Sequence, residues 1–108
     1  MAEIVWTNPA LNDLNYIAEY IAVSNLVAAK QLVKEVFAKV DMLEEYPKSG
    51  ESVSELPFLK YRELYVKPCR IFHKFEDDKA FILQVMLQEQ DLRRFFIRLA
   101  LIHFKYIW

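Results

Sequence analysis

The side chains best suited to chemistry lie in the second half of the chain. Arg70 and His73 stand in one apolar run, and Glu89 follows the next run. A histidine titrates near neutral pH and can transfer a proton, whereas an arginine can face a phosphate. Because His73 lies inside an apolar run, we interpret it as a packed or surface strand histidine rather than as a general base.

Two further motifs argue against metal or thiol chemistry. Cys69 is the only cysteine, so no disulfide can form within the chain and no cysteine cluster can hold a metal. No His, Asn or Asp pattern supports Cys69 as a nucleophile, and a buried small apolar residue is the better interpretation. Asp77 and Asp78 are typical of a turn, since no further carboxylates stand at metal-ligand spacing. The sequence therefore predicts no metal site and no cofactor.

Charged residues also occur within the predicted strands. Arg62 and Glu63 are neighbours, so in a strand they point to opposite faces and do not pair with each other. One interpretation is ordinary surface charge on a strand. The other makes Arg62 or Arg70 part of a surface that binds a partner.

Composition indicates a globular protein without a general affinity for nucleic acid. The 108 residues suit one domain spanning 1–108, and 55% are apolar against 27% charged. The net charge of −1 provides no overall basic field. Three Lys/Arg stand against seven Asp/Glu in residues 1–46, and four Arg/Lys stand against one Asp in residues 91–108. This separation of an acidic N-terminal part from a basic C-terminal part is compatible with a surface that binds a partner in one orientation.

The first half of the chain predicts a strand followed by a helical hairpin. The strand covers Glu3–Thr7, and Asn8-Pro9 is a favourable helix start with Asn at the cap. Ser24-Asn25 interrupts the first helix, and Pro47 ends the second. The apolar positions recurring at three- and four-residue steps are Leu11, Leu14, Ala18 and Ile21, then Ala29, Val33, Val36, Val40 and Leu43. Two helices with so short a break fold back on each other with facing apolar stripes.

The second half predicts a small antiparallel sheet. A polar linker, Lys48–Leu56, precedes three β-prone runs, which are Tyr61–Val66, Arg70–Glu76 and Ala80–Gln88. Pro68 separates the first two runs, and Asp77-Asp78-Lys79 forms a turn before the third. In the third run both alternating sets of residues are largely apolar, which is typical of a central strand covered on two sides.

The C-terminal segment, about residues 91–108, predicts an atypical apolar helix. Two of its faces are apolar, so it either caps the second face of the sheet or forms an interface between copies of the chain. The interface residues would be Phe95, Phe96, Leu99, Ile102 and Tyr106. The segment falls short of the roughly 20 residues of a spanning helix, and the chain opens without a secretory signal. We therefore expect a cytoplasmic protein with an α+β fold in the order β-α-α-β-β-β-α.

Several segments in this order resemble the RelE/ParE toxin superfamily over about Glu3 to Arg94. The segments that carry the resemblance are Trp6–Leu14 with Ile17, Tyr20 and Ile21; Asn25 with Ala28 and Ala29; Leu43–Gly50; Tyr61–Leu64; and Pro68–Lys74. The Arg-Glu pair and the Pro-x-Arg-Ile segment recur in the central strands of that superfamily. Each segment is weak alone, but the ordered set with its spacings is specific.

The resemblance implies the toxin half of a bacterial toxin–antitoxin pair, neutralised by a cognate antitoxin. The ParE-like branch poisons DNA gyrase and is not known as a nuclease, whereas the RelE-like branch cleaves messenger RNA on the ribosome. The long hairpin and the strand motifs look closer to the ParE-like branch. In the RelE-like alternative Arg70 matches the strand arginine, and His73 and Glu89 are the remaining catalytic candidates. The usual acid/base position there holds Gln88-Glu89-Gln90 instead.

Partner surfaces follow from the same resemblance. The residues expected to face the target or the antitoxin are Arg62, Arg70, Arg93 and Arg94. Antitoxins of this group cover the toxin with an amphipathic helix and an extended segment, for which a groove beside the hairpin or a free sheet edge would serve. The apolar tail departs from the superfamily pattern, so a third hypothesis is a non-toxic relative that oligomerises through this tail.

Overall fold

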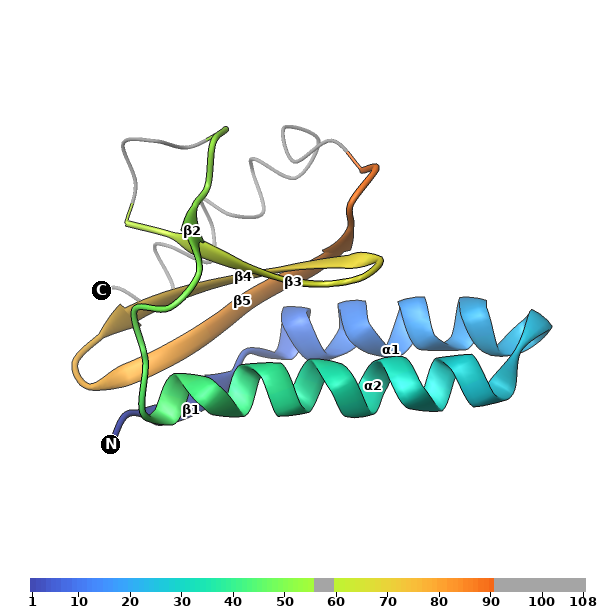
Figure 1. The fold of residues 1–108 in the computed structure, drawn as a ribbon, viewed down its shortest axis with the longest axis horizontal. Coiled ribbons are helices and arrows are strands. Elements are labelled where there is room, and N and C mark those ends of the chain that lie inside the picture. The colour runs from blue at the N-terminus through green and yellow to red at the C-terminus, as the bar shows by residue number, and fades with distance from the viewer. Residues whose placement is uncertain (56–59, 91–108) are drawn as a thin grey trace.

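The computed structural model describes residues 1–55 and 60–90 as a five-stranded sheet with a helical hairpin along one face (Figure 1). The predicted C-terminal helix, its interface residues and the surface residues Arg93 and Arg94 lie outside the described residues. Within the described part, the α+β class is confirmed. No helix there is long and apolar enough to cross a membrane.

The hairpin forms because two polar side chains cap its helices. Strand β1 (Glu3–Trp6) leads into α1 (Asn8–Ser24), and Thr7 Oγ1 accepts a hydrogen bond from Ala10 N at 3.4 Å. The cap is therefore Thr7, one residue before the predicted Asn8. Asn25 alone separates α1 from α2 (Leu26–Asp41), and its Oδ1 accepts from Ala28 N at 3.0 Å.

Each helix packs on the sheet through a stripe of apolar residues, and the sequence predicted the stripe of α2 better than that of α1. In α2 the stripe of Ala29, Val36 and Val40 is buried as predicted. In α1 the buried residues are Ala10, Leu14 and Ile17, whereas Leu11 is 39% exposed, so the predicted stripe was turned too far. Both sets follow helical spacing, and only the orientation of α1 on the sheet selects between them.

The second helix ends earlier than predicted. A single 3₁₀ turn, η1 (Met42–Glu44), follows Asp41, so the helical part stops short of Pro47. Leu43 in this turn is fully buried, which keeps the apolar stripe continuous to its end.

The sheet has the order β1-β5-β4-β3-β2. Its remaining strands are β2 (Glu51–Ser52), β3 (Arg62–Val66), β4 (Cys69–Glu76) and β5 (Lys79–Leu87). Only the β1–β5 pair is parallel, so the prediction of a mostly antiparallel sheet is confirmed, as is the interior position of β5. The short edge strand β2 lies in the segment predicted to be a linker.

Both predicted turns connect adjacent strands. Asp77 and Asp78 adopt φ angles of 54° and 59° between the paired residues Glu76 and Lys79. Positive φ at both central residues is the type I′ geometry that matches the twist of a hairpin. Lys67 and Pro68, joined by a cis peptide bond, form the corresponding two-residue connection between β3 and β4.

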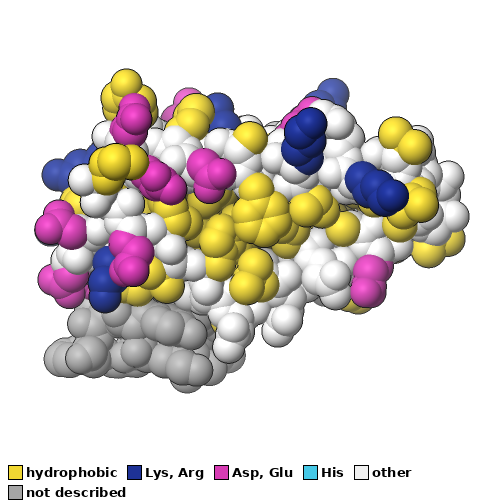
Figure 2. Space-filling model, turned by 90° about the horizontal axis from the view of Figure 1, so that it is seen from below, with side chains coloured by type: hydrophobic (Ala, Val, Ile, Leu, Met, Phe, Trp, Pro, Cys, Tyr) yellow, Lys and Arg dark blue, Asp and Glu magenta, His cyan; other side chains and the backbone are white. Residues whose placement is uncertain are grey.

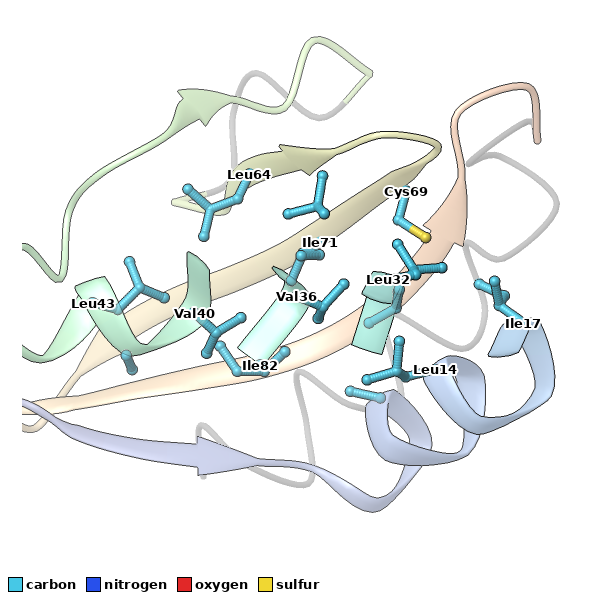
Figure 3. Packing of buried hydrophobic residues seen from close by; sticks show 14 residues of the cluster. Leu14, Ile17, Leu32, Val36, Val40, Leu43, Leu64, Cys69, Ile71 and Ile82 are labelled. Carbon is cyan, nitrogen blue, oxygen red and sulfur yellow. The ribbon is translucent and has the colours of Figure 1, made fainter. Parts of the chain in front are cut away.

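The main core lies between the hairpin and the sheet (Figure 3). Side chains from α1, α2 and the sheet converge there, among them Leu14, Val36, Ile71 and Ile82. The sequence predicted a regular alternation along β5, and this is wrong, because Leu83 forms a bulge without a partner on β4. The bulge lets Ala80, Ile82 and Val85 join the same cluster although their numbers differ in parity.

Candidate functional site

The polar candidates on β3 and β4 gather on the sheet face away from the hairpin. Leu64 and Ile71 pack in the core against the helices. Because strand residues alternate between faces, Glu63, Tyr65 and Arg70 lie on the opposite face, where Tyr65 and Arg70 are directly paired. The two-residue turn between β3 and β4 sets this register.

Arg70 is held there by two carboxylates. Its Nη1 and Nη2 donate to Glu55 Oε2 and Oε1 at 3.0 and 2.8 Å, and Nη2 also donates to Glu63 Oε2 at 2.8 Å. The guanidinium lies 5.0 Å from the ring centre of Phe72, within cation–π distance. The Arg70 side chain is 9% exposed, so these contacts hold a nearly buried charge.

The pKa directions follow from this geometry. Hydrogen bonding to Glu55 and then Glu63 raises the pKa of Arg70 against the opposing effect of burial. Hydrogen bonding to Arg70 lowers the pKa of the Glu55 carboxyl. Tyr65 Oη donates to Glu63 Oε1, and this bond raises the pKa of the Tyr65 hydroxyl. At neutral pH the two carboxylates and one guanidinium carry a formal charge of −1, which disfavours a phosphate at Arg70.

His73 lies on the other side of the sheet from Arg70. It pairs with Ile82, a core residue on the hairpin side, and it is fully buried. Burial, with a smaller contribution from the charge of Arg62, lowers the pKa of His73 to about 4, although the backbone of Ser49 opposes this shift. His73 is therefore neutral at pH 7 and packed, as one of the two sequence interpretations predicted.

The other sequence candidates are also dispersed. Glu89 is exposed just beyond the end of β5. Arg62 points to the hairpin side, and its Nη1 donates to Gly50 O at 3.1 Å, so it does not pair with Glu63, as predicted. Cys69 is buried, as predicted, and burial raises the pKa of its thiol to about 11. Arg70, His73 and Glu89 do not come together in one site.

Sequence reasoning missed two residues of the Arg70 cluster as partners. The Glu63 contact could have been predicted, because a two-residue turn at Lys67-Pro68 pairs Tyr65 with Arg70 and leaves Glu63 diagonal to Arg70. Glu55 carried no such signal, because it comes from the segment after β2 rather than from a neighbouring strand. No group of three or more His, Cys, Asp or Glu able to hold a metal occurs among residues 1–55 and 60–90.

Asp13 is a third residue whose role the sequence did not indicate. Its Oδ2 accepts a hydrogen bond from Val85 N at 3.0 Å. Strand β1 pairs with β5 only as far as Ile82, so Asp13 supplies an acceptor where β1 has ended. The carboxylate thereby ties α1 to β5 just after the bulge.

Comparison with known proteins identifies the family. Residues 4–92 match the profile described as the ParE toxin of the type II toxin–antitoxin system parDE. The chain belongs to this ParE toxin family. The resemblance predicted from the sequence is thereby confirmed, and the described fold is that of a type II toxin.

Individual relatives agree with this assignment. The ParE-family chain is 35% identical over 78 residues to Toxin RelE2 of Caulobacter vibrioides, covering 72% of this chain and 84% of the relative. It matches a structure of the chromosomal ParDE system of P. aeruginosa with a TM-score of 0.71 and 22% identity, covering 82% of this chain and 98% of that one. It also matches the conserved hypothetical protein HP0894 of Helicobacter pylori with a TM-score of 0.51 and 11% identity, covering 83% and 98%. At these identities the two structures support the fold alone.

Proposed function

We propose that this ParE-family toxin acts by binding DNA gyrase and does not cleave RNA. The observation that carries the proposal is the double carboxylate contact of Arg70, the residue that a nuclease would need for the phosphate. Phosphate-ester cleavage requires cations directed at the phosphate and groups that move protons in the same site. Here the arginine is already neutralised, and His73 is buried on the opposite face.

A second candidate function is ribosome-dependent cleavage of messenger RNA. It is favoured by the 35% identity to a relative named Toxin RelE2. In that case Glu55 and Glu63 must release Arg70 when the RNA binds, which requires two buried or partly buried carboxylates to lose their partner. That loss is unfavourable, and it makes gyrase binding the preferred function.

The deciding experiment is induction of the toxin in a bacterial host that lacks the antitoxin. Thymidine and methionine incorporation are followed together over the first minutes. An early fall in DNA synthesis with continued translation supports gyrase as the target, and purified toxin should then inhibit supercoiling by purified gyrase. An early fall in translation contradicts the proposal. If neither changes while the protein is soluble and folded, the chain is the non-toxic relative that its apolar tail also predicts.

Arg70→Ala provides a second readout in the same host. Under the gyrase proposal the variant is expected to weaken toxicity only in part, because the residue supports the sheet face rather than reacting with a substrate. Complete loss of RNA cleavage with an intact fold would instead identify Arg70 as a nuclease residue. Circular dichroism of the purified variant separates loss of function from loss of folding.

We also propose that the cognate antitoxin binds the outer side of the hairpin. An open groove of about 330 Å³ runs between α1 and α2 there, with Ala18, Ala22, Leu26, Ala29 and Val33 on its walls. Figure 2 shows hydrophobic side chains gathered across this side of the molecule. An amphipathic helix can place its apolar face in such a groove.

Substitution in the groove tests the antitoxin surface. Ala22→Arg fills the groove and should leave toxicity intact while weakening neutralisation by the antitoxin at least tenfold. Gln31→Arg adds the same charge to α2 outside the groove and serves as the matched control. Equal neutralisation of the two variants, measured by titrating antitoxin against each, would contradict this surface.

A further inference from the structure

A second pocket lies at the end of the sheet, away from both the Arg70 cluster and the hairpin groove. It has a volume of about 430 Å³ and is formed where the segment after η1 passes the first residues of β3 and the last residues of β4. Pro47 and Lys48 contribute from that segment, Lys60 from just before β3, Arg62 from the start of β3, and Lys74 from β4. Residues far apart in the sequence therefore line one partly open pocket.

The charged residues that line this pocket are basic, among those that the structure describes. Lys48, Lys60, Arg62 and Lys74 line it, and none of its described lining residues carries a carboxylate. Lys74 is buried and forms an ion pair with Glu76, which lies outside the lining. Arg62 is half-buried, and in the described part of the chain it contacts a backbone carbonyl but no carboxylate. Like charges brought together at a partly dehydrated site are stabilised when an anion binds between them.

His73 provides an independent indication of a ligand. It lines the pocket and is fully buried; the backbone of Ser49 lies near the ring, but neither ring nitrogen forms a hydrogen bond of normal distance and angle within the described residues. Buried polar atoms in folded proteins nearly always have partners, so such an atom beside a hollow points to a ligand or to water. The neutral imidazole can donate one hydrogen bond to an anion without a change in protonation.

We propose that this pocket binds a small phosphorylated ligand through its phosphate group. Its volume falls in the range of small-ligand sites, and Lys48, Lys60 and Arg62 with one imidazole donor suit phosphate oxygens, whereas Lys74 is already paired with Glu76. A free ligand fits better than a nucleic acid, because the chain carries a net charge of −1 and has no overall basic field. Pro47, Tyr61 and Phe75 form an apolar wall that suits the nucleoside of a nucleotide.

Titration calorimetry of the full chain with ATP and with inorganic tripolyphosphate tests the proposal. Both probes are expected to bind saturably at one site, with affinity falling as salt rises. Arg62→Gln keeps a donor for Gly50 O and should weaken binding roughly tenfold, and the exposed Lys60→Ala roughly threefold. Lys34→Ala removes an exposed charge from α2 outside the pocket and should leave binding unchanged.

The outcomes are distinct. Tighter binding of ATP than of tripolyphosphate supports a nucleotide with its base on the apolar wall, whereas equal binding supports a phosphate site without a nucleoside. In either case nitrogen NMR signals of the His73 ring should shift on binding. Absence of saturable binding overturns the proposal, as does equal weakening by Lys34→Ala and Lys60→Ala. Tighter binding of an oligonucleotide than of ATP also overturns the proposal, provided that Arg62→Gln does not change the affinity for the oligonucleotide.

Discussion

The two faces of the sheet arise from the same strands but are stabilised in different ways. Toward the hairpin, Leu64, Ile71 and Ile82 pack against apolar side chains of α1 and α2. On the opposite face, Glu63 and Arg70 are almost as well buried but depend on hydrogen-bonded charge pairs. Apolar packing tolerates small changes in shape, whereas a buried charge requires a particular partner at a particular distance. The two faces should therefore respond differently to substitution.

The largest effect is expected on the hairpin side. Ile71→Ala leaves a cavity beneath α2 and should lower the free energy of unfolding by about 3 kcal/mol, since Ile71 is fully buried in the core. Urea unfolding followed by circular dichroism measures the change. Val27→Ala, at a position 77% exposed on α2, is the control and should change stability by less than about 0.5 kcal/mol. Similar values for both variants would contradict the assignment of the core.

A smaller but more specific effect is expected on the opposite face. Glu63→Ala removes a partner of Arg70 and the acceptor of Tyr65, and it should lower the free energy of unfolding by about 2 kcal/mol. Replacing both charges, as Glu63→Leu with Arg70→Met, should be less destabilising, because the only carboxylate left without a partner is that of Glu55, which is 26% exposed. The same urea titrations compare the two proteins. A double variant less stable than Glu63→Ala would show that the pair itself contributes the stability.

The bulge in β5 determines which residues reach each face, and Asp13 stabilises the backbone next to it. Asp13→Ala leaves the Val85 amide without its acceptor and should lower the free energy of unfolding by about 1 kcal/mol. Hydrogen exchange of the Val85 amide should become faster in this variant. Asn15→Ala, which removes only an exposed contact with Glu19, should change neither quantity appreciably.

The smallest effect is a pH dependence from the rim of the Arg70 cluster. Arg70 lowers the pKa of Glu55 below its ordinary value of 4.5, so Glu55 stabilises the folded state fully above that pH. The contribution is lost as the pH falls through the lowered pKa. Because the Glu55 side chain is 26% exposed, we expect Glu55→Gln to lower stability by less than about 1 kcal/mol at pH 7. The difference from the unsubstituted chain should vanish in acid, as measured by urea unfolding between pH 7 and pH 3.

These differences explain how much of the molecule could be predicted from sequence. The hairpin, the Asp77-Asp78 turn and the three main strands follow from local signals, namely apolar spacing, caps and turn residues. Local signals also predict that Arg62 and Glu63 lie on opposite faces. They do not determine the rotation of α1, because Leu11 and Ala10 both satisfy a helical stripe and only contact with β5 selects Ala10.

The site was less predictable because it depends on contacts between distant segments. The bulge at Leu83 interrupts an alternation that appears regular in the sequence, so the expected face of each later residue in β5 is inverted. Glu55 reaches Arg70 from a segment that reads as a polar linker. His73 and Arg62 line the same pocket because their strands are paired, a relation that turn chemistry fixes but composition does not reveal.

Gly50 connects the hairpin to the sheet, and its geometry has a genetic consequence. It is the only glycine of the chain, with φ of 97°, and a Cβ built there would lie 2.5 Å from the backbone oxygen of Glu63. Any side chain would therefore push the backbone leading to β2 away from β3, besides straining the left-handed backbone. In a selection for cells that survive induction of the toxin, substitutions at codon 50 should recur even though the residue itself need not contact the target.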